Sequence, residues 1–152
     1  RTESTIAFAE SCTGGLASSL VTDVPGSSEY LLGSAVTYSN MAKHKLINVS
    51  EESLEAYGAV SWQVACEMAQ GVRELFGTTY GVGITGIAGP SGATEDKPVG
   101  LVYMAVADAD GVKWAKHVFG GTRTDNKMRS ALTAISMVID RIKEKETENK
   151  DK

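Results

Sequence analysis

The sequence predicts an α/β fold, a single-domain α/β/α sandwich with a mixed, partly antiparallel sheet. Short apolar runs typical of buried strands alternate with longer segments whose apolar residues recur every three or four positions, as on one face of a helix. Two neighbouring strand-like runs are joined by Asp110-Gly111, a hairpin signal, so part of the sheet is antiparallel. The 152 residues, of which 42% are apolar and 22% charged, are enough for one domain with a well-filled core.

The first half of the chain predicts two strands and four helices. A strand is expected over residues 5–9. A helix follows it, as indicated by Leu16 and Leu20, which lie four positions apart. Ser39 or Asn40 has a side-chain oxygen that can cap a later helix. The other elements expected in this half are a strand at 34–38 and helices from 39 or 40 to 46, at 51–57 and at 61–76.

The second half predicts three strands, a long loop and a final helix. Met128, Leu132 and Ile135 lie at helical spacing and give that helix an apolar face. The expected elements are strands at 79–85, 99–107 and 112–119, a loop at 86–98 and a helix from about 124 to 143. Residues 143–152 carry eight charges of both signs, so we expect a solvated, fraying end beyond a folded domain at 1–142.

The composition excludes several classes of function. A net charge of −4 gives no support for binding a phosphate backbone, so no nucleic-acid partner is expected. No apolar run approaches the roughly 18 residues that a membrane span needs, so no membrane association is expected. Cys12 and Cys66 lie in unrelated contexts without disulfide or zinc spacing, which predicts a reducing, cytoplasmic location.

The stretch Glu-Ser-Cys-Thr-Gly-Gly at residues 10–15 lies between the first strand and its helix. Ligands of open α/β sheets bind beyond the carboxyl ends of strands, so this cluster and the loop after the third strand are expected to share one pocket. Ser11 can act there as a nucleophile, with amides at the start of the helix holding an oxyanion. Alternatively, Ser11 or Thr13 only caps the helix, and Cys12 is either a rival nucleophile or a small buried apolar residue.

Lys43 lies one turn into the helix that follows the second strand. The helix dipole disfavours a cation there and so lowers the lysine pKa, which suits a base that takes a proton from a serine hydroxyl. Alternatively, Lys43 binds an anionic group of the substrate or is an ordinary surface lysine. His44 and His117 are the two histidines, and neither fits a Ser-His-acid pattern, so no histidine triad is expected.

Two further segments are expected at the pocket. Residues 81–92 hold five of the chain's 16 glycines, and such a loop can point successive amides at a phosphate or carboxylate. Its G-x-G-x-x-G spacing begins inside the expected strand, so we infer no dinucleotide motif from it. Arg123 can hold an anion through its planar guanidinium. Alternatively, the glycine-rich segment is a plain flexible connection, and Arg123 is an ordinary surface arginine.

Six short motifs occur in one order along the chain: ESCTGG (10–15), VTYSNxxK (36–43), GAVS (58–61), GIAGP (86–90), DKPVG (96–100) and GxR (121–123). Together they resemble the C-terminal domain family of the competence/damage-inducible protein CinA, the nicotinamide-nucleotide amidase family, over about residues 5–142. The resemblance implies an α/β domain that converts nicotinamide mononucleotide and water into nicotinic acid mononucleotide and ammonia. It implies no cofactor and no metal, and it implies a homo-oligomer.

The same resemblance implies that Ser11 is the nucleophile and Lys43 its basic partner, with Thr13 and Tyr38 catalytic beside them. The substrate-binding residues that it implies are Glu10, Cys12, Gly14, Gly15, Ser39, Thr85, Gly86, Ala88, Gly89, Pro90 and Arg123. The sequence departs from the family pattern at Thr122, where an acid is common, and at residues 1–4, where the family usually has a helix. It contains no molybdopterin-binding type of N-terminal domain, so we expect a stand-alone protein or an excised domain.

Two other functions remain open from the sequence. One is a non-catalytic nucleotide-binding or protein-interaction domain linked to competence or the DNA-damage response. The other is an amidase for a different small amide. Nicotinamide, its riboside and the mononucleotide distinguish these functions, because only an enzyme that depends on the phosphate loses activity on the first two.

Overall fold

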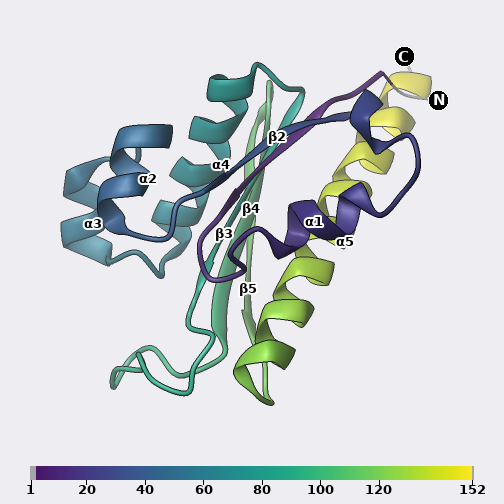
Figure 1. The fold of residues 1–152 in the computed structure, drawn as a ribbon. Coiled ribbons are helices and arrows are strands. Elements are labelled where there is room, and N and C mark those ends of the chain that lie inside the picture. Colours follow the sequence, from purple (N-terminus) through teal and green to yellow (C-terminus); the bar gives the residue numbers. More distant parts are fainter. Residues whose placement is uncertain (1–2, 152) are drawn as a thin grey trace.

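The computed structural model describes residues 3–151, and its centre is a five-stranded sheet (Figure 1). The strands, in the sheet order β2-β1-β3-β4-β5, are β2 (Leu31–Val36), β1 (Ile6–Glu10), β3 (Tyr80–Gly86), β4 (Leu101–Asp108) and β5 (Gly111–Val118). β1 runs parallel to both β2 and β3, whereas β4 pairs antiparallel with β3 and with β5. The mixed, partly antiparallel sheet predicted from the sequence is confirmed.

Helices cover both faces of this sheet and complete an α/β/α sandwich (Figure 1). One side carries α2 (Asn40–Ile47), α3 (Glu51–Tyr57) and α4 (Trp62–Phe76), and the other carries α1 (Leu16–Thr22) and α5 (Arg123–Lys150). A short 3-10 helix, η1 (Ser27–Glu29), leads into β2. Among residues 3–151, no helix has the length and apolar character that crossing a membrane requires.

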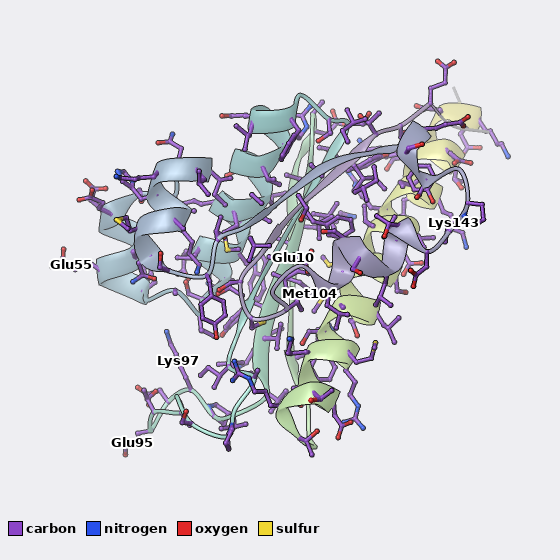
Figure 2. The ribbon with its side chains drawn as sticks, viewed as in Figure 1. Glu10, Glu55, Glu95, Lys97, Met104 and Lys143 are labelled. Atoms are coloured by element: carbon purple, nitrogen blue, oxygen red, sulfur yellow. The ribbon has the colours of Figure 1, made fainter. Side chains whose placement is uncertain are left out.

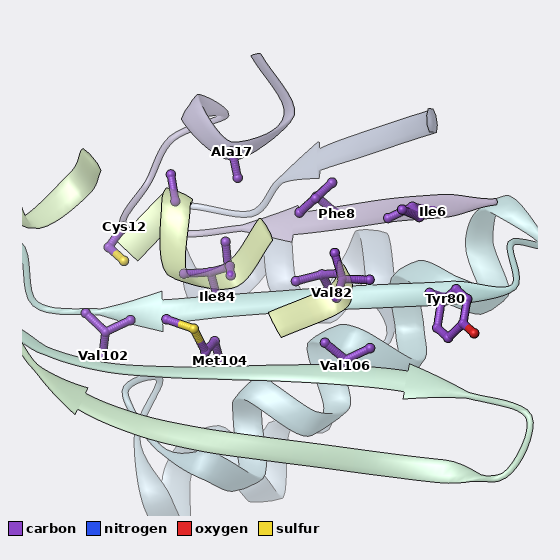
Figure 3. Close-up of a cluster of buried hydrophobic side chains, with 13 residues drawn as sticks. Ile6, Phe8, Cys12, Ala17, Tyr80, Val82, Ile84, Val102, Met104 and Val106 are labelled. Atoms are coloured by element: carbon purple, nitrogen blue, oxygen red, sulfur yellow. The ribbon is translucent and has the colours of Figure 1, made fainter. Parts of the chain in front are cut away.

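Alternation along β1 divides the core between the two faces of the sheet. Phe8 belongs to the cluster under α1 and α5, together with residues such as Ile84 and Met104 (Figure 3). Its neighbours Ala7 and Ala9 belong to the cluster under α4. All of these side chains are fully buried, as the period of two in a strand with two covered faces requires.

Two glycines of β3 let α4 lie close to the sheet. A Cβ at Gly81 would stand 2.1 Å from Ala69 O, and one at Gly83 would stand 2.4 Å from Ala65 O. The first two glycines of the G-x-G-x-x-G spacing therefore make room for the helix backbone. This contact explains the spacing without a nucleotide.

Most elements lie within two residues of the predicted bounds, and β2 and α5 depart further from the sequence prediction. β2 spans Leu31–Val36 instead of residues 34–38, so it begins and ends earlier, and the Phe76 ring lies against Gly33 within it. α5 continues to Lys150 instead of ending near residue 143. Ion pairs from its last turns to the β4–β5 hairpin, including Arg141 with Asp108 at 2.8 Å, hold this end of the helix.

Candidate active site

A cavity of about 330 Å³ opens beyond the carboxyl ends of β1 and β3. The segment after β1 and the glycine-rich segment after β3 both contribute to its walls, as the sequence predicted. Its lining residues are Ser11, Cys12, Tyr38, Lys43, Ala59, Val60, Thr85, Gly86, Ile87, Ala88, Gly89, Ser91, Gly92 and Arg123.

The cavity places a serine hydroxyl in contact with a lysine amine. Lys43 Nζ lies 2.9 Å from Ser11 Oγ and 2.8 Å from the carbonyl oxygen of Thr37. Ser11 is fixed by its backbone N–H, which donates to Ile84 O at 3.0 Å. Lys43 is fixed by α2, whose first turn is capped by the Ser39 hydroxyl. The contact at Thr37 is made by a main-chain carbonyl, which a pattern of side-chain types does not reveal.

Burial makes Lys43 a candidate base. Its side chain is 1% exposed, and this desolvation lowers the lysine pKa from 10.5 to about 8. A substantial fraction is therefore neutral near physiological pH, and a neutral amine has the lone pair that a base needs. The sequence predicted a lowered pKa from the helix dipole, whereas the cause in the structure is burial.

Burial moves the pKa of the thiol next to Ser11 in the opposite direction, because it disfavours the charged form of both groups. Burial of Cys12 in the core cluster raises its pKa to about 12, so the thiol stays protonated. Cys12 touches the cavity, but it lacks the thiolate that a nucleophilic cysteine requires. Of the two interpretations drawn from the sequence, the small buried residue fits this environment.

The amides at the start of α1 are already occupied. The backbone N–H groups of Ala17 and Ser18 donate to the Glu10 carboxylate at 2.8 and 3.0 Å. The helix is not capped by Ser11 or Thr13, because its N-cap is Gly15 in the left-handed conformation. An oxyanion at Ser11 therefore has to be held by groups other than the first turn of α1.

Arg123 links two walls at the mouth of the cavity. Its Nη1 donates to Gly89 O at 2.6 Å, and its Nη2 donates to the hydroxyl of Tyr38 at 3.0 Å. One turn further along α5, Asn126 Nδ2 donates to Ala88 O at 2.9 Å. The start of α5 thus holds the glycine-rich loop in place over the pocket.

The long loop is also tied to the opposite helical layer. Lys97 Nζ donates to the carbonyl oxygen of Tyr57 at the end of α3, across the lower part of the molecule (Figure 2). On the same side, Thr85 Oγ1 donates to Ala59 O at 2.8 Å. These two bonds connect α3 and the segment after it to the strand and loop that shape the cavity.

The residues predicted from the sequence fall into two groups in the structure. Those that line the cavity are Ser11, Cys12, Tyr38, Lys43, Thr85, Gly86, Ala88, Gly89 and Arg123. Those that do not line it are Glu10, Thr13, Gly14, Gly15, Ser39 and Pro90. The lining residues that the sequence analysis missed are Ala59 and Val60, which are small or apolar and have no chemical signature. Ile87, Ser91 and Gly92 also line the cavity and lie in the segment 81–92 that was expected there.

The chemistry available at this site belongs to the serine and the lysine. Within residues 3–151, no three His, Cys, Asp or Glu side chains are grouped so that they could hold a metal ion. The arrangement can deprotonate a hydroxyl, attack a carbonyl carbon and return the proton to a leaving group.

The family described as the CinA C-terminal domain matches residues 1–142. CinA-like proteins from Syntrophomonas wolfei and Koribacter versatilis are 51% and 52% identical over 88% of this chain, which spans about a third (32%) of their length. The crystal structure of the competence/damage inducible protein CihA from Agrobacterium tumefaciens superposes with a TM-score of 0.89 and 38% identity, over 91% of this chain and 85% of that one. The crystal structure of a CinA superfamily protein from Escherichia coli superposes with a TM-score of 0.87 and 31% identity, over 90% of this chain and 80% of that one. The chain belongs to the CinA C-terminal domain family.

Proposed function

We propose that this domain is an amidohydrolase that converts nicotinamide mononucleotide into nicotinic acid mononucleotide and ammonia. The observation that carries the proposal is the 2.9 Å contact between Lys43 Nζ and Ser11 Oγ at the wall of the cavity. Membership of the CinA family supports the same reaction through the motif resemblance. A nucleophile next to an amine that loses its proton near pH 8 is the arrangement that acyl transfer from an amide needs.

The first half of the proposed reaction forms an acyl-enzyme. Neutral Lys43 takes the proton of the Ser11 hydroxyl, and Ser11 Oγ attacks the carboxamide carbon of the nicotinamide ring. The tetrahedral intermediate then collapses, the C–N bond breaks, and Lys43 gives its proton to the departing nitrogen, which leaves as ammonia. The pyridinium ring assists by withdrawing electrons from the carbonyl group.

The proposed donor for the oxyanion lies in the turn that follows Ser11. Within the described residues, no main-chain carbonyl accepts the N–H of Cys12, whereas Gly14 N donates to Ser11 O at 3.1 Å. Cys12 follows the nucleophile directly and lines the cavity, whereas Thr13 does not line it. We assign the oxyanion to the N–H of Cys12, because a backbone donor that is fixed before the reaction stabilises developing charge effectively.

The second half of the reaction releases the acid. Water attacks the ester carbon, Lys43 accepts its proton, and Ser11 leaves with that proton restored. The Thr37 carbonyl holds the lysine amine throughout, because its 2.8 Å contact is independent of the substrate.

The proposed site for the substrate phosphate is the mouth of the cavity. Arg123 stands there with guanidinium N–H groups beyond the two that contact Gly89 O and Tyr38. Lys43 is committed to Ser11 and is buried, so the phosphate role falls to the arginine and the loop amides at 86–92.

Ammonia release by the purified chain tests the proposal. Wild type, Ser11→Ala and Lys43→Met are compared on nicotinamide mononucleotide, the riboside and nicotinamide, and circular dichroism verifies that each variant is folded. We expect release from the mononucleotide by wild type alone. Tight binding of the mononucleotide without ammonia release would favour a non-catalytic nucleotide-binding domain, and equal activity on all three amides would point to another small amide.

A further inference from the structure

Glu10 is a buried carboxylate beside the proposed nucleophile that does not face the substrate cavity. Its side chain is fully buried and lies inside the molecule, next to α1 (Figure 2). Its two oxygens are contacted by Thr13 Oγ1 (2.7 Å), Ala17 N (2.8 Å), Ser18 N (3.0 Å), Ser34 Oγ (3.4 Å) and Ser18 Oγ. The carboxylate is thus fully engaged within the protein.

We propose that Glu10 is a positioning residue, which fixes the turn that carries Ser11 against Lys43 and makes no contact with substrate. The proposal rests on the proposed function, in which Ser11 is the nucleophile. It differs from the expectation drawn from the sequence, which placed Glu10 and Thr13 in direct contact with the substrate or the reaction.

The side chain of Glu10 connects the turn after Ser11 to the start of α1. The turn over residues 11–14 is closed by the bond from Gly14 N to Ser11 O. The Thr13 hydroxyl within this turn donates to Glu10 Oε1, and the same oxygen accepts the N–H of Ala17 at the start of α1. Glu10 therefore locks the turn to the helix, and the turn carries Cys12, whose N–H is assigned to the oxyanion.

The main chain of Glu10 holds the lysine side of the site. Its carbonyl oxygen accepts the N–H of Thr37 at 2.8 Å, and the Thr37 carbonyl in turn accepts a hydrogen bond from Lys43 Nζ. Ser11 follows Glu10 directly in the chain. One residue thus joins the two members of the reacting pair, whose separation of 2.9 Å depends on both connections.

Glu10→Gln separates positioning from other roles with little change in volume. The amide replaces one acceptor oxygen with an NH2 group, which then faces donors of Thr13 and α1 instead of accepting from them. The turn has to shift, and displacements of about 1 Å at a reacting atom cost about 100-fold in rate. We expect kcat to fall about 10- to 100-fold while KM changes less than about threefold, because Glu10 does not line the cavity.

Two further variants keep the test independent of folding. Thr13→Val removes only the bond from the turn to Glu10 and leaves the α1 amides bound, so kcat falls in the same direction. Asp108→Asn is the matched control. Asp108 is also a buried carboxylate, it accepts a hydrogen bond from Arg141, and it lies at the other end of the sheet. The substitution lowers the melting temperature and leaves kcat unchanged. A fall in melting temperature for Glu10→Gln with kcat intact, or a rise in KM alone, overturns the proposal.

A second readout does not depend on the substrate. An alkyl fluorophosphonate labels an activated serine: Ser11 Oγ bonds to phosphorus, fluoride leaves, and Lys43 takes the proton. We expect labelling of Ser11 to be slower in Glu10→Gln and Thr13→Val than in wild type and Asp108→Asn. If wild type is labelled but releases no ammonia, the proposed function fails and the role of Glu10 stands. Equal labelling rates in wild type and Glu10→Gln, or no labelling of Ser11 in wild type, overturn the role of Glu10.

Discussion

At the scale of single residues, the burial of one amine determines what the site can do. A lysine in water has a pKa near 10.5 and is almost fully charged at pH 7, whereas Lys43 has a pKa of about 8 because its side chain is buried. The contact with Ser11 Oγ then gives this amine a proton to accept. The proposed catalysis therefore has to depend on pH in a defined direction.

The rate should rise with pH as Lys43 loses its proton. We predict that kcat/KM for ammonia release increases about tenfold per pH unit well below pH 8 and levels off above it, because only the neutral amine can act as a base. A profile from pH 6 to 9.5 measures the apparent pKa. A plateau that extends down to pH 6 would contradict the assignment of Lys43 as the base.

Stability should follow the same group. The folded protein releases the Lys43 proton near pH 8 and the unfolded chain near pH 10.5, so the unfolded state binds more protons between those values. We predict that the free energy of unfolding gains up to about 3 kcal/mol from this group as the pH rises through that window. Urea unfolding at pH 7, 8, 9 and 10 measures the gain, and Lys43→Met should lack it. An equal pH dependence in both proteins would refute the burial argument.

The two thiols should be inert in the folded protein. Burial raises the pKa of Cys12 to about 12 and that of Cys66 to about 11, so neither forms thiolate at pH 8. We predict alkylation by iodoacetamide at least about 100-fold slower than for a free cysteine, and normal rates in urea. Mass spectrometry of the alkylated peptides follows both sites. Rapid modification of Cys12 in the native state would reopen it as a nucleophile.

The sequence predicted much of this site because reactive side chains have recognisable types and positions. Ser11, Lys43 and Arg123 follow strand ends or begin helices, where the chemistry of a sheet edge is expected. The type and position of a residue do not reveal the direction in which its side chain points. Glu10 points at α1 rather than into the cavity, because the short helix leaves its first amides without acceptors and the carboxylate satisfies them.

At the scale of elements, the position of α2 determines the position of Lys43. α2 is held against α4 at Gly71, where a Cβ would stand 1.8 Å from the carbonyl oxygen of Ile47. The helix that carries the proposed base thus depends on the absence of a side chain in another helix. The sequence prediction gave both helices but not this contact, because helical periodicity does not reveal which helices cross closely.

Gly71→Ala should destabilise the protein although it replaces a glycine within a helix. Alanine normally favours a helix by about 1 kcal/mol over glycine, but here its methyl group meets rigid backbone. We predict a net loss of about 2 kcal/mol and a fall in kcat as α2 is displaced. The control is Gly120→Ala, which meets no atom within 4 Å and should change stability by less than about 0.5 kcal/mol. Chemical denaturation compares the two, and a stabilised Gly71→Ala would show that α2 is free to move.

At the scale of the whole molecule, the site and the last turns of α5 lie at opposite ends of the sheet. The cavity lies at the carboxyl ends of β1 and β3, whereas the chain termini lie together at the opposite end of the sheet (Figure 1). The last turns of α5 contact the β4–β5 hairpin through ion pairs, including Lys113 with Glu144 at 3.0 Å. The charged segment at 143–152 was expected to fray, and the helix in fact runs through it to Lys150.

Removal of residues 143–152 should therefore weaken the protein without affecting the site. The ion pairs of Glu144 and Lys145 are lost, and exposed or partly exposed pairs contribute about 1 kcal/mol in total. We predict a melting temperature lower by about 2–4 °C and unchanged ammonia release per folded molecule. Thermal melts and activity assays of the chain ending at Ile142 test this, and a truncated chain that fails to fold would contradict a domain boundary at that residue.

The central claim is that Ser11 attacks the carboxamide with Lys43 as its base, and trapping the acyl-enzyme tests it most directly. Enzyme and nicotinamide mononucleotide are mixed, quenched in acid within milliseconds and digested, and the peptide that contains residues 10–13 is fragmented in the mass spectrometer. We predict a nicotinoyl-nucleotide adduct on Ser11 that appears before ammonia release reaches its steady rate and is absent from Lys43→Met. An adduct on Cys12, or ammonia release by Ser11→Ala at the wild-type rate, would contradict the account.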